Sequence, residues 1–178
     1  AHFIIENDDN SKVLYVTSEE FTNELIETIR DEKKICHYLD IPIQHASDRI
    51  LKRMGRRTSK QELIDIVGKL RKEIPDIVLR TTLITGFPGE TEEDFQESLE
   101  FLKKVGFSQV HVFKYSKRAG TAAAKRPEQV SEEVKHERSE RAIALATELS
   151  ERFAEQYVGT AREVLIEERC EDGWVGYT

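Results

Sequence analysis

Polar side chains recur at alternate positions in three short, otherwise apolar segments of the sequence, 38–44, 77–84 and 109–115. In a β-strand, alternate residues point to opposite faces, so each segment would present one apolar face and one polar face. The residues on the polar faces are Asp40, Gln44, Arg80, Thr82, His111 and Tyr115. If the strands run side by side, these residues line a common site suited to a polar small molecule.

Arg80 has the clearest chemistry of this set. A guanidinium in a pocket can hold a carboxylate through two parallel hydrogen bonds. It is also costly to bury unless its charge is met, and Asp40 on a neighbouring strand is the obvious partner. A ligand-binding arginine and a structural ion pair are therefore equal alternatives. Gln44 and Ser47, where the segment 38–44 ends, have donors and acceptors for a ribose or the polar end of an amino acid.

A glycine-bearing turn follows the segment 77–84. Gly86 and Gly89 flank Pro88 and free the backbone to bend, so that main-chain amides can approach a ligand. Thr91 then predicts a helix N-terminus with acidic residues in its first turn. Taken alone, the Gly-Phe-Pro-Gly run is better interpreted as a tight turn. A phosphate cradle is disfavoured, because neither of the usual glycine-rich phosphate motifs is present.

Familiar catalytic groupings are missing from the sequence, which has no Ser-His-Asp set and no pair of carboxylates placed for acid–base work. His111 lacks a second His or Cys at ligand spacing, so an interior hydrogen-bonding role is favoured over metal binding. His45 is predicted to be a supporting residue. Cys36 and Cys170 lack C-x-x-C partners, which predicts two reduced thiols and neither a zinc site nor a disulfide framework.

Four segments with strand character begin near residues 12, 38, 77 and 109, and each precedes a predicted helix. Successive strand–helix units predict parallel strands joined by right-handed crossovers. A doubly wound sheet and a partial (βα) barrel both fit this pattern. The barrel is favoured, because a sheet covered on both faces has continuous apolar strands without recurring polar positions.

The sequence divides into three parts. Residues 1–11 carry a short apolar run and turn residues, and no role is assigned to them. Residues 12–157 form the α/β domain. In residues 158–178, two strand segments flank a Cys-Glu-Asp-Gly turn, which predicts a β-hairpin at the beginning of a small β domain.

The 178 residues carry a formal net charge of −7, which argues against a general polyanion-binding protein. Two local basic clusters are interpreted as solvated helix ends in preference to a nucleic-acid surface. These clusters are Lys52, Arg53, Arg56 and Arg57, and Lys114, Lys117, Arg118, Lys125 and Arg126. No apolar run approaches the roughly 20 residues of a membrane span. Because no signal peptide precedes the first strand, we expect a soluble cytoplasmic protein without a membrane partner.

Three motifs, in the same order, resemble the radical S-adenosylmethionine (SAM) methylthiotransferases. They are Tyr38-Leu-Asp-Ile-Pro-Ile-Gln-His-Ala-Ser47, Leu79-Arg-Thr-Thr-Leu-Ile-Thr-Gly-Phe-Pro-Gly-Glu-Thr91 and Tyr115-Ser-Lys-Arg-Ala-Gly-Thr-Ala-Ala123. The first is similar to the branch of the family that modifies an aspartate of a small-subunit ribosomal protein. The branch that modifies an adenosine of transfer RNA is the alternative, and it more often carries a Pro-Val-Gln-Ser-Gly-Ser version.

The resemblance implies four of the six units of a partial barrel, followed by the first hairpin of a TRAM-like β domain. It also implies reductive cleavage of SAM, hydrogen abstraction and insertion of a methylthio group, with 4Fe-4S clusters doing the difficult chemistry. The family's C-x-x-x-C-x-x-C cluster motif does not occur among these residues, which contain only Cys36 and Cys170. No catalytic side chain, no metal ligand and no turnover are therefore expected from the chain alone.

The resemblance also implies which residues line the SAM pocket. They are Gln44, Ser47, Arg80, Thr82, Ile84, Gly86, Phe87, Gly89, Tyr115 and Ser116. Arg80 is the candidate for the methionine carboxylate, and backbone groups near Ile84 and Gly86 are candidates for the adenine.

Two other classes of function compete with this interpretation. A non-catalytic module would present its surface to ribosome or RNA and bind without SAM. An ordinary (βα) barrel enzyme acting on phosphorylated metabolites would use residues 117–121 as a phosphate loop.

Overall fold

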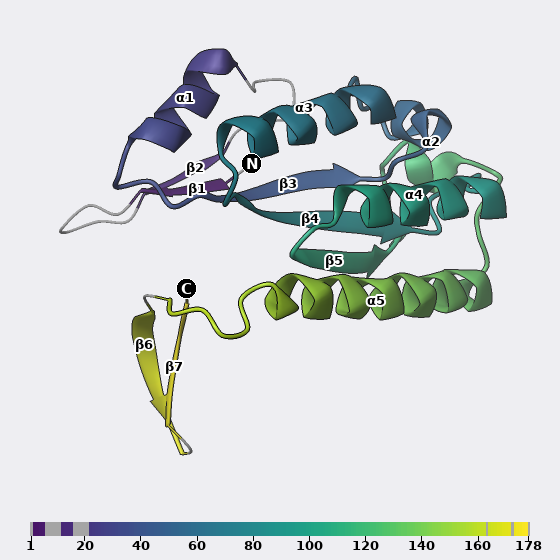
Figure 1. Ribbon diagram of the computed structural model, residues 1–178. Helices are drawn as coiled ribbons and strands as arrows, with labels where there is room; N and C mark the ends of the chain where they lie inside the picture. The colour runs from purple at the N-terminus through teal and green to yellow at the C-terminus, as the bar shows by residue number, and fades with distance from the viewer. Residues whose placement is uncertain (1, 6–11, 16–21, 163, 172, 178) are drawn as a thin grey trace.

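The computed structural model describes residues 2–5, 12–15, 22–162, 164–171 and 173–177. A parallel sheet lies at its centre, with helices packed on one face and a long C-terminal helix beside its last strand (Figure 1). A two-stranded sheet precedes this centre along the chain and a hairpin follows it. The predicted α/β class, a partial barrel of parallel strands followed by a β-hairpin, is confirmed.

The parallel sheet has three strands in the order β3-β4-β5. They are β3 (Tyr38–Gln44), β4 (Val78–Thr85) and β5 (Gln109–Lys114). In this register Asp40 lies opposite Arg80. Strands that follow one another along the chain are thus neighbours in space, as expected when each pair is joined by a helical crossover.

Burial alternates residue by residue along β4, as the sequence predicts. Leu79, Thr81, Leu83 and Thr85 are buried, and the residues between them are half-exposed. The buried side chains belong to one hydrophobic core with the helices. The opposite face of the sheet is more open, and we call it the open face.

The first predicted strand does not join the parallel sheet, and this corrects the expectation of four parallel units. β2 (Lys12–Tyr15) pairs antiparallel with β1 (His2–Ile5), so the N-terminal segment of unassigned role supplies a strand. Two apolar runs separated by Asn and Asp residues are typical of an antiparallel pair. Four residues are too few to fix their own pairing partner, and the prediction gave β2 the wrong one. The intervening residues 6–11 lie outside the described part of the chain.

The helices follow the predicted pattern and are closed by local caps. They are α1 (Asn23–Asp31), α2 (Asp48–Arg53), α3 (Lys60–Glu73), α4 (Glu92–Val105) and α5 (Glu132–Glu155), with the short 3-10 turn η2 (Ala123–Lys125) before α5. Capping boxes begin α3 at Ser59 and α4 at Thr91, because each hydroxyl accepts an amide that would otherwise be unpaired. Gly106, in a left-handed conformation, ends α4.

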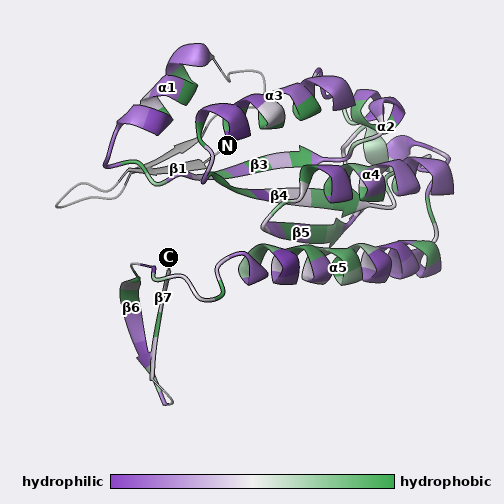
Figure 2. Cartoon of the chain, in the orientation of Figure 1, coloured by the Kyte–Doolittle hydropathy of each residue, from purple (hydrophilic) through white to green (hydrophobic). Residues whose placement is uncertain are grey.

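Helix α5 lies along β5 and also contacts α4. Its buried stripe continues the apolar positions Ala142, Leu145 and Leu149 with two charged residues, Lys135 and Arg138. Figure 2 shows hydrophobic residues on the strands and hydrophilic residues along the outer sides of the helices. The two buried cations are therefore exceptions that need partners.

The C-terminal part forms the predicted hairpin, in which β6 (Leu165–Cys170) pairs antiparallel with β7 (Gly173–Tyr177). The guanidinium of Arg169 lies over the exposed ring of Trp174, and this contact stabilises the hairpin. The assignment of residues 158–178 to a TRAM-like domain stays a prediction. Within the described residues, every helix is too short or too polar to traverse a lipid bilayer.

Candidate functional site

Three polar residues form a line across the open face of the sheet, one from each strand. Arg80 Nη1 donates to Asp40 Oδ2 at 2.7 Å, and Arg80 Nη2 donates to His111 Nε2 at 2.5 Å. Because a guanidinium can only donate, Nε2 of His111 is the acceptor and its ring hydrogen is on Nδ1. The predicted convergence of these three residues is confirmed.

Arg80 already has partners at both terminal nitrogen atoms, and its buried Nε has no hydrogen bond in the described part of the chain. It is also the third residue of β4, about 16 Å along an extended strand from Thr85. The ion-pair alternative therefore describes its present geometry, and a contact with a methionine carboxylate stays a prediction.

The carboxyl ends of β3 and β4 present polar side chains without such partners. Gln44 has a left-handed backbone, with φ of 68°, and the parallel register shifts between Ile41 and Gln44. Thr82 and Ile84 are half-buried on the open face, and Gln44 at the end of β3 is aligned with Leu83 of β4. The side chains of Gln44 and Thr82 make no hydrogen bond to any described residue. Since a left-handed conformation is strained for a non-glycine residue, Gln44 is held at this position by its surroundings.

Phe113 extends this surface on β5. Its ring is 55% exposed and stacks against His111 with a centroid separation of 6.5 Å. We refer to Gln44, Thr82, Ile84 and Phe113 as the mouth. It combines free polar groups with an apolar ring at the carboxyl edge of a parallel sheet, where α/β proteins commonly bind ligands.

Ser47 lies apart from the mouth. It is buried, its hydroxyl donates to Asp94 Oδ1 at 2.7 Å, and its amide donates to His45 Nδ1 at 3.0 Å. The side chain thus faces α4 and helps to position the segment between β3 and α2. Its predicted contact with a ligand would require a different rotamer.

The glycine turn after β4 is organised by one buried carboxylate, that of Glu90. The Gly86 amide donates to Oε1 at 3.0 Å and to Oε2 at 2.9 Å, and the Phe87 amide donates to Oε2 at 3.4 Å. The Glu90 side chain has no exposed surface. A buried carboxylate that accepts several donors is a strong local anchor.

Two side chains from other elements complete this anchor. Arg138 of α5 reaches Glu90 Oε1 at 2.8 Å, and His45 Nε2 lies 3.2 Å from Oε2. Because His45 Nδ1 accepts the Ser47 amide, its hydrogen is on Nε2, which donates to Glu90. We call Glu90, His45 and Arg138 the buried triad. It joins the end of β3, the glycine turn and α5.

The predicted approach of the glycine amides to a ligand stays a prediction, because both amide hydrogens have partners within the protein. Gly86 N–H is occupied by Glu90, and Gly89 N–H donates to the Glu128 carbonyl at 2.7 Å. The space where a Cβ of Gly86 would lie is filled by the Lys135 side chain. The glycines therefore make room for neighbouring side chains of the protein itself, and sequence spacing could not distinguish this from room for a ligand.

Phe87 and Tyr115 pack against each other beside the turn, edge to face at 5.4 Å between ring centroids. Lys135 Nζ lies 5.5 Å from the Tyr115 ring centroid, and the buried Tyr115 hydroxyl has no hydrogen-bond partner among described residues. Ser116 follows and is exposed. The structure thus brings the predicted aromatic residues together and adds a cation over one of them.

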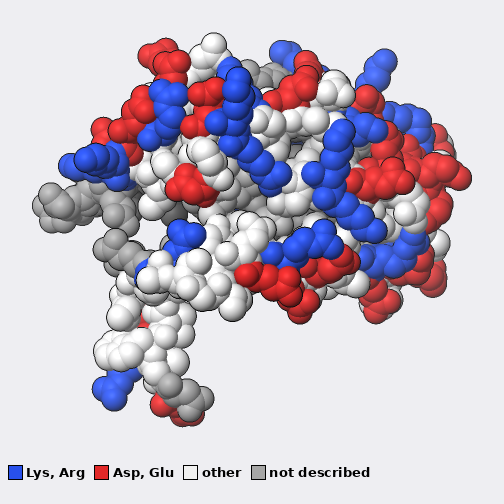
Figure 3. All heavy atoms as spheres, in the orientation of Figure 1, with Lys and Arg blue, Asp and Glu red and all other residues white. Residues whose placement is uncertain are grey.

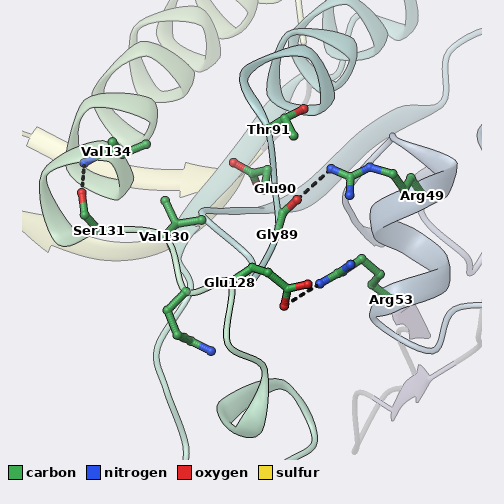
Figure 4. Close-up of a pocket in the computed structure, with 10 residues that line it drawn as sticks. Arg49, Arg53, Gly89, Glu90, Thr91, Glu128, Val130, Ser131 and Val134 are labelled. Atoms are coloured by element: carbon green, nitrogen blue, oxygen red, sulfur yellow. Dashed lines mark hydrogen bonds and ion pairs between the residues drawn. The ribbon is translucent and has the colours of Figure 1, made fainter.

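An open cleft of about 570 Å³ lies between α2 and the beginning of α5. Figure 4 shows Arg49 and Arg53 on one side, Ser131 and Val134 on the other, and Gly89 between them. Of the predicted site residues, the cleft includes only Gly89. It is therefore separate from the mouth on the open face.

Asp94, at the third position of α4, is the other buried carboxylate of this region. Burial by itself would raise its pKa, but hydrogen bonds from Arg49, the Thr91 amide and hydroxyl, and Ser47 outweigh burial and hold the pKa well below its usual range. The charged form of Asp94 therefore stabilises the fold.

We expect Asp94→Asn to lower the free energy of unfolding at pH 7 by about 2 kcal/mol, because it weakens a capping box and a charged hydrogen bond. A depressed pKa contributes stability above the unfolded-state pKa of about 3.9 and loses it as pH falls further. The difference in free energy of unfolding between the wild type and Asp94→Asn should therefore shrink below about pH 4. Urea denaturation at pH 7 and pH 3 measures it, with exposed Asp65→Asn as the control. A gap that is the same at both pH values would contradict this account.

Cys36 and Cys170 are exposed and unpaired, and no group of three His, Cys, Asp or Glu side chains within the described ranges could hold a metal ion. Sequence reasoning missed the buried triad and Lys135. The only available signal was the helical spacing of Lys135 and Arg138 with the apolar residues of α5.

Comparisons with known proteins agree with this architecture. Residues 2–102 match the Radical SAM superfamily. The chain is 51% identical over 169 residues to a protein named ribosomal protein uS12 methylthiotransferase RimO from Lachnoclostridium phytofermentans, with 94% of this chain and 38% of that protein covered. Proteins of the same name from Pelotomaculum thermopropionicum and Alkaliphilus oremlandii are 51% and 46% identical, over 94% and 98% of this chain and 38% and 40% of their own lengths.

The chain thus spans 38% to 40% of the length of these curated relatives. Their names confirm the resemblance to the ribosomal-protein branch of the methylthiotransferases. The family match covers more than half of the 178 residues and includes β3, β4 and the glycine turn. By this match, the chain belongs to the radical SAM superfamily.

Proposed function

We propose that this chain is part of a radical SAM methylthiotransferase that inserts a methylthio group at the β-carbon of an aspartate in ribosomal protein uS12. Relatives named for uS12 methylthiotransferase are 46% to 51% identical over nearly the whole chain. The observation that carries a SAM site is the mouth, where polar side chains without partners gather at the carboxyl edge of parallel strands. An enzyme with a ribosomal substrate would act in the cytoplasm.

The proposed SAM pocket is built from the mouth outward. Gln44 and Thr82 supply the free hydrogen-bonding groups, and Ile84 supplies an apolar surface for a nucleoside. Arg80 lies beneath them, held by Asp40 and His111. Its cation favours a bound carboxylate above it even without direct contact.

The loop part of the pocket positions the ligand by its shape. Phe87 and Tyr115 form one wall, and Ser116 lies at its rim. Gly86 and Gly89 shape the turn, since their amide hydrogens are already used. Ser47 supports the site through Asp94.

Bound SAM, with a reducing 4Fe-4S cluster, would supply the carbon radical that this chemistry requires. The residues of this chain do not fit the cluster, because its two cysteines are exposed and lack the spacing of cluster ligands. We assign the cluster to no residue here and expect no turnover from the chain alone.

Calorimetric titration with SAM and with inorganic phosphate tests the proposal. We expect SAM to bind and Thr82→Val to weaken binding about fivefold to tenfold, the value of one neutral hydrogen bond. Thr147→Val is the matched control, because Thr147 is exposed on α5 and bonds only within its helix. Binding of phosphate but not SAM would instead favour an ordinary barrel enzyme with a loop at residues 117–121. Equal SAM affinity of both valine variants would remove Thr82 from the pocket.

A further inference from the structure

Two stretches of this acidic protein contain no acidic residue at all. Residues 49–61 carry six Lys or Arg and no Asp or Glu, and residues 114–127 carry five Lys or Arg and no Asp or Glu. The chain as a whole has 34 acidic and 27 basic residues. Positive charge is thus concentrated in two segments of a chain whose net charge is negative.

The structure joins these two stretches. Arg126 Nη2 donates to the Arg53 carbonyl at 3.3 Å, although the residues are 73 positions apart. The segment before Arg126 is compact, because the Thr121 hydroxyl donates to the Arg118 carbonyl and accepts from the Ala124 amide. The C-terminal end of α2 and the segment ending in η2 therefore form one continuous part of the molecule (Figure 1).

Six exposed cations lie on these two segments, and we call them the basic surface. They are Lys52, Arg56, Arg57, Lys117, Arg118 and Lys125. Among the described residues, none of the six has a carboxylate within ion-pair distance. Other exposed arginines do have such a partner, as Arg30 and Arg152 illustrate. Figure 3 shows Lys and Arg side chains over α2, next to an acidic area over the start of α4.

The basic surface is close to the glycine turn that follows β4. A Cβ on Gly89 would lie 2.6 Å from Arg53 Nη2, so α2 touches this turn directly. The basic surface thus adjoins, through α2, the glycine turn that follows the carboxyl end of β4. A partner bound there would lie beside a substrate that enters the mouth.

The chemistry of this surface suits a phosphate backbone better than a protein. Protein interfaces usually have an apolar centre. The large exposed hydrophobic side chains among the described residues all lie outside 49–61 and 116–126. Exposed Lys and Arg without internal partners are suited to phosphates, because they release counterions from a polyanion.

In place of the sequence-based interpretation of these clusters as solvated helix ends, we propose that the basic surface binds the phosphate backbone of RNA and docks the protein beside its substrate. The choice of RNA over DNA rests on the proposed function, since a ribosomal protein is surrounded by ribosomal RNA. Binding of RNA itself does not require SAM, so the two proposals can fail separately.

Fluorescence anisotropy with a labelled 20-base-pair RNA hairpin, between 50 and 200 mM salt, tests the proposal. The Arg56→Gln, Arg57→Gln double variant should weaken binding by on the order of 10²-fold at 0.1 M salt and reduce the salt slope by about 2. Lys103→Gln, Lys104→Gln is the matched control, because these are adjacent exposed cations at the other end of α4. The control should change affinity by less than about threefold.

Three results would overturn the proposal: no RNA binding at 50 mM salt, equal weakening by the two double variants, or tighter binding of polyglutamate than of RNA. Tighter binding of a DNA hairpin of the same sequence would overturn the choice of RNA. The Arg56, Arg57 variant should keep the wild-type affinity for SAM. That titration, together with circular dichroism, distinguishes a lost docking surface from a damaged fold.

Discussion

Glu90→Gln should lower the free energy of unfolding by about 3–5 kcal/mol, the usual cost of leaving one member of a buried ion pair without its partner. Arg138, whose side chain is 7% exposed, would keep its charge with one carboxylate contact, 3.4 Å from Nε to Glu92, besides its hydrogen bond to the Glu90 carbonyl. The new amide group would also place a donor against the donors of Gly86 and Phe87. We therefore expect the glycine turn to lose its fixed shape.

Glu92→Gln is the matched control for this variant. Glu92 also pairs with Arg138, and with Arg141 at 2.6 Å, but its side chain is 45% exposed. Loss of a solvent-exposed pair should cost at most about 1 kcal/mol. Adding Arg138→Met to Glu90→Gln should recover part of the loss, because the unpaired buried charge is then gone. Urea denaturation measures all four proteins, and equal losses in Glu90→Gln and Glu92→Gln would refute the buried triad as the anchor.

Gly86→Ala should destabilise the protein by about 2–5 kcal/mol, through two costs that add. The φ of Gly86 is 73°, and a left-handed conformation costs an L-residue about 1–2 kcal/mol. The new methyl group would also overlap the Lys135 side chain, which is 5% exposed and held by Glu132. Crowding of a packed site typically costs about 1–3 kcal/mol.

Two other glycines separate these costs. Gly55 has a φ of 78° and open space around its Cβ position, so Gly55→Ala should cost only the backbone strain of about 1–2 kcal/mol. Gly68 lies inside α3 with open space and an ordinary helical conformation, so Gly68→Ala should stabilise by about 0.5–1 kcal/mol. Urea denaturation of the wild type and the three alanine variants ranks their free energies of unfolding. A loss in Gly86→Ala no larger than that in Gly55→Ala would mean that Lys135 moves aside freely.

Local patterns predicted the elements that depend on neighbouring residues. The alternation of β4 was predictable because side chains change face at every residue of a strand. The starts of α3 and α4 were predictable because a capping box needs only residues three positions apart, as in Ser59 with Glu62. The family resemblance rested on motifs that are likewise contiguous in the sequence.

Contacts between distant residues could not be predicted in the same way. The sequence of the four residues of β2 is compatible with a parallel or an antiparallel strand. Only the pairing with β1 shows that the strand is antiparallel. The sequence around Gly86 indicated space for a ligand. Only the position of Lys135 in the structure shows what fills that space.

The sequence by itself determined the strand and helix pattern, the polar face of the sheet and the family, because these depend on periodicity and on short motifs. The tertiary structure alone decided the partners of the charged residues. Arg138 is 48 positions from Glu90, and Arg126 is 73 positions from Arg53. The sequence around a charged residue does not indicate its partner. The free-energy cost of burying the charge is offset only by a residue that folding brings beside it.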